Sequence, residues 1–249
     1  MRKRKNRQQD RCFFIEGLKS AEEAITAKTS IKNIVVSENF MKSENYNKVK
    51  KLYSSTYRKS VELCLLPVSD NIYNFLTETE TPQGIGVLAA YEDHILRDEI
   101  VPGGKYLLME NIQDPGNVGT IIRTCDAAAF NGVILTTGCA DVYNSKTLRS
   151  TAGSVFHIPF YCVESVENVK PLLKAANMKI FSTGLRGGLN CFEADFSGGC
   201  VIIVGNESNG LTESALAACD QILTIPMPGE AESLNVSVAA SLLVYAALI

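Results

Sequence analysis

The stretch Cys-Val-Ile-Ile-Val-Gly-Asn-Glu-Ser-Asn-Gly-Leu occupies residues 200–211, and Gln-Ile-Leu-Thr-Ile-Pro-Met-Pro-Gly follows at residues 221–229. Each begins with a short β-branched run, Val201–Val204 and Ile222–Ile225, with the length and composition of a buried parallel strand. Each run ends in a loop of Gly, Asn, Ser, Pro or Glu, where backbone amides and carbonyls can face a ligand. One such loop is an ordinary turn, whereas two at neighbouring strand ends indicate a binding site.

The chain from residue 105 to residue 249 alternates strand patterns with helix patterns. Besides the two runs above, strands are expected at residues 106–109, 132–136, 157–162 and 179–183, and helices at residues 117–130, 145–154, 166–177 and 236–249. This alternation predicts an α/β fold, with a parallel sheet covered on both faces and ligands beyond the carboxyl ends of its strands. The patterns Gly-x-Gly-x-x-Gly and Gly-x-x-x-x-Gly-Lys do not occur, which disfavours a Rossmann dehydrogenase and a P-loop enzyme.

The part before residue 105 divides into three segments. Residues 1–11 carry six basic side chains against Asp10, which indicates a basic flexible arm, either merely solvated or in contact with phosphates. Residues 12–91 form a small α/β domain, with strands expected at residues 13–17, 31–36, 61–65 and 84–90 and helices at residues 21–27, 46–57 and 68–77. Residues 92–104 are charged and end in Pro-Gly-Gly, which is typical of a linker.

Composition limits the classes of function. The formal net charge is −3 and 46% of the residues are hydrophobic, so we expect a globular protein that could meet a nucleic acid only through a local patch. Basic residues at 48, 50, 51, 58 and 59 could form such a patch or an ordinary solvated face. No apolar segment opens the chain, which predicts a cytoplasmic protein. Eight cysteines without a Cys-x-x-Cys pair, and only two histidines, predict that no metal is bound.

Three motifs together resemble a known family. They are Asn111-Ile-Gln-Asp-Pro-Gly-Asn-Val-Gly-Thr-Ile-Ile-Arg-Thr124, Gly205-Asn-Glu-Ser-Asn-Gly-Leu211 and Ile225-Pro-Met-Pro-Gly-x-x-x-Ser-Leu-Asn-Val-Ser237. Their order and sequence are similar to those of the SpoU (TrmH-type) RNA ribose 2′-O-methyltransferases, from about Lys105 to the end of the chain. The phrases Phe-Ile-Glu-Gly (14–17) and Thr-Pro-Gln-Gly-Ile (81–85) resemble that family's substrate-binding domain, which is similar to ribosomal protein L30e.

The resemblance implies a fold, a donor and an RNA substrate. It implies a SPOUT domain at residues 105–249 with a deep trefoil knot, preceded by an L30e-like RNA-binding domain at residues 12–91. The donor would be S-adenosylmethionine, whose activated methyl group needs no metal, and the acceptor a ribose 2′-hydroxyl. The front domain favours 23S-type ribosomal RNA. Two alternatives stay open, a tRNA ribose methyltransferase and a non-catalytic RNA-binding protein of the same fold.

The resemblance also assigns roles to single residues. The residues implied to bind the donor are Thr183, Gly184, Gly205, Ile225, Ser233 and Leu234. The residues implied to act in catalysis are Asn117, Arg123, Glu207, Ser233 and Asn235. Each has a structural alternative: Asn117, Ser233 and Asn235 could cap helices, Ile225 and Leu234 could be ordinary core, and Arg123 and Glu207 could be solvated. A guanidinium stays protonated, so Arg123 is better suited to clamping a phosphate than to removing a proton.

The closing segment predicts how the chain assembles. Val236–Ile249 has no charged side chain on any face and is too short to span a bilayer, so we expect no membrane partner. A helix that is apolar all round must be covered on every side. A second copy of the chain is the economical cover, and the resembling family dimerises through its knotted domain, so we expect a homodimer.

Overall fold

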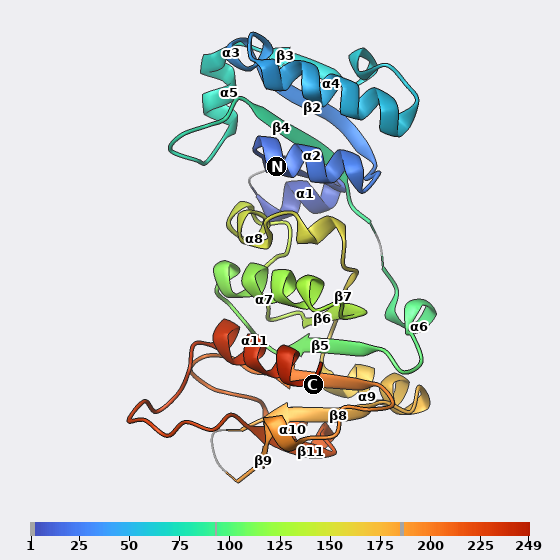
Figure 1. Cartoon of the computed structure of the whole chain (residues 1–249), viewed down its shortest axis with the longest axis vertical. Coiled ribbons are helices and arrows are strands. Elements are labelled where there is room, and N and C mark those ends of the chain that lie inside the picture. Colours follow the sequence, from blue (N-terminus) through green and yellow to red (C-terminus); the bar gives the residue numbers. More distant parts are fainter. Residues whose placement is uncertain (1–2, 93, 185–186) are drawn as a thin grey trace. The chain divides into compact units, whose positions relative to one another are not determined.

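The computed structural model describes residues 3–92, 94–184 and 187–249, and their elements are labelled in Figure 1. The chain divides into two compact units. The front unit is Met1–Asp93 with Tyr143–His157, and the sheet unit is His94–Val142 with Ile158–Ile249. The segment Tyr143–His157, which the sequence analysis counted with the later domain, therefore clusters with the front unit.

The front unit is built on a four-stranded mixed sheet. The strand order is β1-β4-β2-β3, with β4 antiparallel to both neighbours and β2 parallel to β3. The strands are β1 (Cys12–Glu16), β2 (Ile31–Ser37), β3 (Leu65–Val68) and β4 (Ile85–Ala90). The helices are α1 (Arg4–Asp10), α2 (Leu18–Thr26), α3 (Glu38–Met41), α4 (Glu44–Tyr57), α5 (Asp70–Leu76) and α8 (Ser145–Thr151), with 3₁₀ turns at Val61–Leu63 and Ser154–Phe156.

Two segments of the front unit differ from the sequence analysis. The expected arm forms helix α1, consistent with its Arg, Lys and Gln content, and Arg7 in it is buried; Met1 and Arg2 lie outside the described residues. The strand expected at residues 61–65 lies later, at β3, because a 3₁₀ turn occupies Val61–Leu63. Pro67 is tolerated in β3 because this strand is at the edge of the sheet.

The expected linker is mostly part of the sheet unit. Its residues from His94 onward belong to that unit, and Leu96 in helix α6 (Leu96–Glu99) packs into the hydrophobic core. The backbone N–H of Val101 donates a hydrogen bond of 2.9 Å to the hydroxyl of Tyr106 on the first strand of the large sheet. Asp93 lies outside the described residues. The Pro-Gly-Gly sequence lies in a turn directly before β5.

The sheet unit confirms the predicted parallel α/β fold. Its seven strands are all parallel and lie in the order β7-β6-β5-β10-β8-β11-β9. The strands are β5 (Lys105–Met109), β6 (Gly132–Thr136), β7 (Phe160–Val163), β8 (Lys179–Thr183), β9 (Leu189–Asn190), β10 (Cys200–Val204) and β11 (Gln221–Thr224). The helices are α6, α7 (Pro115–Ala127), α9 (Val166–Ala175), α10 (Glu213–Ala218) and α11 (Val236–Ala246), with a 3₁₀ turn at Cys191–Glu193.

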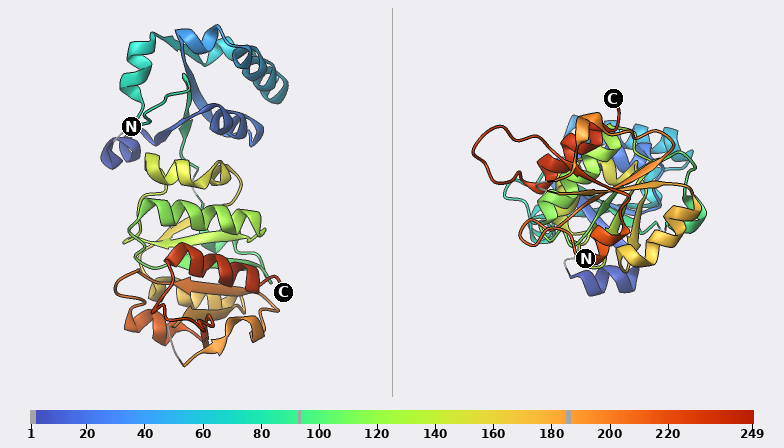
Figure 2. Two further views of the ribbon diagram at one scale, coloured as in Figure 1. Left: turned by 60° about the vertical axis from the view of Figure 1, so that its left-hand side comes forward. Right: turned by 90° about the horizontal axis from the view of Figure 1, so that it is seen from below.

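Helices cover both faces of this sheet. α9 and α10 pack on the face that bears Leu108, Ile134 and Ile203, and α7 and α11 lie side by side on the other (Figure 2). β5 and β10 are buried at the centre of the sheet, as their β-branched and leucine-rich sequences predict. In the register of these two strands Met109 lies opposite Val204, so the loops that follow them begin next to each other.

The closing helix α11 has one buried and one exposed side. Its inner residues pack against the sheet, and Ser241 on it forms a 3.1 Å hydrogen bond with Thr124 of α7. The outer side carries Val238 and Tyr245, which are 47% and 50% exposed, one above the other at a spacing of seven residues. In the part of the chain that the structure describes, no helix has the length and hydropathy needed to cross a bilayer.

Candidate active site

Four strands of the large sheet deliver their loops to one edge. β5, β10, β8 and β11 are adjacent and parallel, so their carboxyl ends face the same side. All three motifs of the sequence analysis begin at or just after one of these ends. Loops at such an edge form the usual ligand site of a parallel α/β sheet.

The loop at residues 205–211 is held in shape by Asn206. Its Oδ1 accepts hydrogen bonds from the backbone N–H groups of Ser208 (2.9 Å) and Asn209 (3.1 Å), and its Nδ2 donates to the carbonyl of Asn111 at 2.9 Å. Backbone hydrogen bonds between Asn206 and Gly210 close the loop in both directions. Gly210 has φ +67°, a left-handed conformation that glycine adopts without strain.

Gly205 allows the two ends of this loop to approach closely. A Cβ added at this position would lie 2.5 Å from the carbonyl carbon of Gly210 and 2.7 Å from the backbone nitrogen of Leu211. These are backbone atoms, which cannot move aside as a flexible side chain would. The glycine at the start of the motif is therefore required by the packing of the loop itself.

A cavity of about 460 Å³ opens between these loops. Its lining includes the six residues that the sequence analysis assigned to donor binding, Thr183, Gly184, Gly205, Ile225, Ser233 and Leu234. Ile225 is half-buried and Leu234 is 36% exposed, so neither is ordinary core. The structure thus brings the predicted donor-binding residues together in one place.

Three of the predicted catalytic side chains form a chain of hydrogen bonds. Asn117 Nδ2 donates to Glu207 Oε1 at 2.7 Å, and Asn235 Nδ2 donates to Asn117 Oδ1 at 3.2 Å. The side-chain amide of Asn117 thus uses both its donor and its acceptor to connect two motif loops. Glu207 also lines the cavity, so the hydrogen-bond chain and the cavity share this residue.

The structure shows which of the residues Asn117, Ser233 and Asn235 cap a helix. Asp114 caps α7, because its Oδ1 accepts from the backbone N–H of Asn117 at 3.0 Å, which leaves the side chain of Asn117 available for the network. Asn235 caps α11 by accepting from the backbone N–H of Ser237 at 2.9 Å, and it reaches Asn117 with its other side-chain atom. Asn235 therefore has both roles, and Ser233 caps neither helix.

Arg123 stands apart from the network. It lies on the exposed side of α7, six residues after Asn117, which corresponds to about 9 Å along the helix axis. Ile121 and Cys125 fill the buried side, as the helical spacing predicts. Within residues 3–92, 94–184 and 187–249 no side chain forms a hydrogen bond or an ion pair with the guanidinium. Ser233 lines the cavity without joining the hydrogen-bond chain.

Glu110 is a further acidic residue near this edge, and the sequence analysis missed its role. It is buried directly after β5, and its two carboxylate oxygens accept from the backbone N–H of Thr212 (2.9 Å) and from its hydroxyl (2.8 Å). This pairing fixes the end of the loop at residues 205–211 and the start of α10. An acidic residue directly after a buried strand was the signal that could have identified it.

The thiols near the site serve packing. Burial raises the pKa of Cys125 on the inner side of α7, and burial also raises the pKa of Cys139, whose Sγ lies 3.2 Å from the carbonyl of Met109. Both thiols therefore stay protonated and are poor nucleophiles. In the described part of the chain, His, Cys, Asp and Glu side chains form no group of three or more that could hold a metal ion.

Comparison with known proteins gives two family matches. The model of the SpoU rRNA Methylase family matches residues 104–245, and that of the MRM3-like substrate binding domain matches residues 1–87. The chain is 37% identical over 242 residues to the Bacillus subtilis 23S rRNA (guanosine(2553)-2′-O)-methyltransferase RlmP, covering 97% of this chain and 90% of that one. It is 32% identical to the Streptomyces viridochromogenes 23S rRNA (uridine(2479)-2′-O)-methyltransferase, covering 67% of this chain and 60% of the relative.

Two solved structures are similar over almost the whole chain. The AdoMet-bound rRNA methyltransferase from Sinorhizobium meliloti has a TM-score of 0.86 and 29% identity, covering 98% of this chain and 90% of that chain. The SpoU methyltransferase AviRb from Streptomyces viridochromogenes, in complex with AdoMet, has a TM-score of 0.87 and 26% identity, covering 99% and 92%.

Proposed function

The chain belongs to the SpoU rRNA Methylase family, and from this premise we propose that it transfers a methyl group from S-adenosylmethionine to a ribose 2′-hydroxyl of ribosomal RNA. The observation that carries the proposal is the cavity of about 460 Å³ that shares Glu207 with the hydrogen-bonded pair Asn117 and Asn235. Such an arrangement can hold a donor on one side of Glu207 and an acceptor on the other. The Bacillus subtilis relative, which acts on 23S rRNA, supports ribosomal RNA as the substrate.

The cavity suits the donor in size and in lining. Small-molecule sites usually enclose about 300–1,000 Å³. The loops around Gly205, Ile225 and Leu234 would hold the donor through backbone groups, with Thr183, Gly184 and Ser233 beside them. The donor supplies an already electrophilic methyl group on a sulfonium, so no metal is needed. The task left to the protein is to orient a hydroxyl and to receive its proton.

The hydrogen-bond chain is suited to orient the acceptor. Asn235 and Glu207 fix both ends of the Asn117 amide, and Glu207 Oε2 remains available as an acceptor for a ribose hydroxyl. Arg123, an exposed cation without a partner among the described residues, would clamp the phosphate beside that ribose through its planar fork. It would not serve as the base, because a guanidinium does not lose its proton at physiological pH.

The decisive experiment offers the purified chain its two possible RNA classes. The chain is incubated with radiolabelled S-adenosylmethionine and either unmodified 23S rRNA transcript or bulk tRNA transcripts, and 2′-O-methyl nucleotides are mapped. We expect transfer to one nucleotide of 23S rRNA. Transfer to tRNA alone would favour the tRNA alternative. Binding of RNA without transfer, together with no binding of S-adenosylmethionine in calorimetry, would favour a non-catalytic RNA-binding protein.

We further propose that the chain is a homodimer that uses the outer side of α11. Val238 and Tyr245 form an exposed apolar stripe that Leu248 continues, and this helix packs on α7, which carries Arg123. Burial of an apolar face yields about 25 cal/mol per Å², enough for a stable dimer at standard interface size. Sedimentation equilibrium should give a dimer for wild type and a monomer for Tyr245→Glu. The control Leu216→Asp, at an exposed apolar residue of α10, should stay dimeric.

Two finer proposals rest on the family alone. The first is that the chain of the sheet unit is threaded into a deep trefoil knot. The second is that the protein works in the cytoplasm. A crystal structure with a continuous chain trace tests the first proposal. Fluorescence microscopy of a tagged chain expressed from its own promoter tests the second, and a signal confined to the cell envelope would contradict it.

A further inference from the structure

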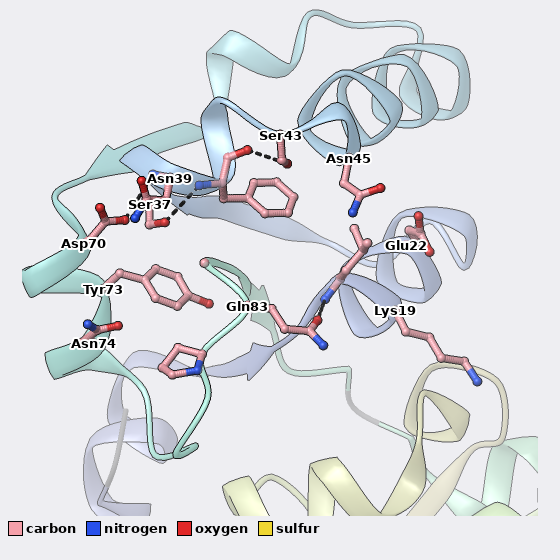
Figure 3. Close-up of a pocket in the computed structure, with 14 residues that line it drawn as sticks. Lys19, Glu22, Ser37, Asn39, Ser43, Asn45, Asp70, Tyr73, Asn74 and Gln83 are labelled. Carbon is pink, nitrogen blue, oxygen red and sulfur yellow. Dashed lines mark hydrogen bonds between the residues drawn. The ribbon is translucent and has the colours of Figure 1, made fainter.

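The front unit contains a larger cavity, of about 680 Å³, that is separate from the site described above (Figure 3). It lies between α2, α3, α5 and the turn that leads into β4. Its polar lining includes Lys19, Glu22, Ser37, Asp70, Tyr73 and Gln83. Phe40 and Pro82 add apolar surface. The volume is in the usual range for a site that takes a small molecule or one unit of a polymer.

Tyr73 is the least ordinary residue in this lining. Its side chain is only 1% exposed, yet its hydroxyl forms no hydrogen bond with any described residue. Figure 3 shows the ring extending from α5 toward Gln83, with the hydroxyl at the cavity end. Burial raises the pKa of Tyr73, so the hydroxyl stays protonated and can both donate and accept. Buried hydroxyl groups nearly always have a partner, and Tyr73 is part of the lining of this cavity.

Gln83 presents a donor of fixed orientation to the same space. Its Oε1 accepts from the backbone N–H of Leu18 at 2.8 Å, at the first turn of α2. This bond decides which way the amide group is turned, since only its oxygen can accept. The Nε2 group therefore points away from Leu18 and makes no hydrogen bond within the described residues.

Asp70 adds a hydrogen-bond acceptor to the lining, and Ser37 adds a donor. Asp70 Oδ1 accepts from the backbone N–H of Asn39 at 3.1 Å, which leaves its other oxygen available as an acceptor. The Oγ of Ser37 accepts from the backbone N–H of Phe40 at 3.2 Å, so its own proton can be donated. The lining thus offers both donors and acceptors within one cavity.

The charge of the lining argues against an anion. It contains one ammonium group, Lys19, against two carboxylates, Glu22 and Asp70. A phosphate would meet net repulsion here, whereas a neutral group with several donors and acceptors would not. The apolar surfaces of Phe40 and Pro82 suit a flat ring. A nucleobase has this combination, and proteins read unstacked bases of RNA by hydrogen bonds to their edges and by stacking.

We propose that this cavity receives one unstacked nucleobase of the RNA substrate, with the Tyr73 hydroxyl and the Gln83 amide bonded to its edge. The inference rests on the proposed function only in that it takes RNA as the ligand. It adds a point of sequence recognition in the front unit, remote in sequence from the methyl-transfer motifs. Phosphate contacts position an RNA, whereas base contacts specify it, so the front unit would help to choose the nucleotide.

The first experiment compares two tyrosine variants of the full chain. Tyr73→Phe removes a hydroxyl that has no partner in the protein, so the melting temperature should stay unchanged or rise, while affinity for 23S rRNA transcript should fall about three- to tenfold. Tyr57→Phe is the matched control, because the Tyr57 hydroxyl is already bonded to the carbonyl of Thr29 at 2.6 Å. It should lower the melting temperature and leave RNA affinity within about twofold. Equal RNA affinity of Tyr73→Phe and wild type would overturn the proposal.

A second experiment identifies the base. Single abasic nucleotides are placed at each unpaired position of the shortest 23S rRNA fragment that the protein binds. The affinities of wild type and Tyr73→Phe for each of these RNAs are then compared. One position should weaken the wild type without weakening the variant further, since both changes remove the same contact. If every abasic position affects both proteins equally, the cavity receives no base.

The same variants separate this inference from the proposed function. At saturating RNA, Tyr73→Phe should keep its methylation rate and raise only the KM for RNA. Gln83→Glu, which keeps an oxygen for the N–H of Leu18 and loses the donor, should behave in the same way. Wild type that binds RNA but transfers no methyl contradicts the proposed function, and the affinity comparison still decides the inference. If wild type transfers methyl and neither substitution changes the KM for RNA, only the inference is contradicted.

Discussion

Glu207 offers the sharpest test of how the site works, because its carboxylate could either hold Asn117 in place or take the proton of the ribose hydroxyl. The two variants Glu207→Gln and Glu207→Ala separate these roles. Glutamine keeps an Oε1 atom that can accept from Asn117 Nδ2, whereas alanine removes the 2.7 Å hydrogen bond altogether. Neither glutamine nor alanine can accept a proton at neutral pH.

The size of each effect follows from the geometry. A hydrogen bond to a charged group contributes about 1.5–3 kcal/mol, and because Glu207 is exposed to water we reduce this to about 1 kcal/mol. If Glu207 only positions Asn117, the methylation rate should fall about fivefold in Glu207→Ala and stay within about twofold of wild type in Glu207→Gln. If Glu207 is the general base, both variants should lose about 100-fold or more.

The assay is single-turnover methylation of 23S rRNA at saturating donor, with donor affinity measured separately by calorimetry. Because Glu207 Oε2 remains available as an acceptor, we expect the result for a general base. The methylation rate should fall equally and strongly in both variants, and donor affinity should stay within about threefold of wild type. A Glu207→Gln enzyme that works nearly as fast as wild type would refute the assignment of proton transfer to this residue and leave it a positioning role.

Three further expectations follow from single residues. Arg123→Ala should lower the methylation rate about 100-fold with donor affinity unchanged, and Arg123→Lys should recover little because an ammonium lacks the planar fork; equal loss of donor affinity would contradict this role. Gly205→Ala should lower the melting temperature by about 3–8 °C and weaken donor binding, because its Cβ meets backbone of Gly210; unchanged calorimetry would contradict the packing argument. Burial by itself would raise the pKa of Glu99, but hydrogen bonds from the backbone N–H of Ile95 and from His94 outweigh it, so the net shift is downward. The stability that this carboxylate adds is then present above its unfolded pKa and lost as pH falls through the folded one, so Glu99→Gln should flatten the acid side of a melting curve series between about pH 7 and about pH 3.

The sheet unit was the most predictable part from sequence. β6 and β8 lie at the predicted bounds, because short apolar runs between polar turns favour a buried strand. β9, with two residues, and α10, with six, are too short to produce a periodic signal. In the front unit the run at Val61 was misplaced because its apolar residues fit a 3₁₀ turn as well as a strand.

The sequence predicted which residues belong to the site but not which of them form hydrogen bonds with each other. The motifs identified Asn117, Glu207 and Asn235, yet nothing in their spacing indicates that Asn235 bonds Asn117 across 118 positions. That contact depends on β10 lying between β5 and β8, a strand order that only tertiary packing decides. The separation of Arg123 from the network was likewise invisible, because a helical wheel gives the face of a side chain but not its neighbours.

The grouping of Tyr143–His157 with the front unit decides which segments of sequence must be exchanged together when the front unit is swapped between relatives. The chain passes from one unit to the other at three places along its length, after residues 93, 142 and 157. A recombination that replaced only the first 93 residues would transplant an incomplete module and remove the β1 residues against which α8 packs. The front unit therefore includes a segment that lies within the region matched by the SpoU family model. A chimera designed to give this enzyme a new RNA target must carry both pieces of sequence or neither.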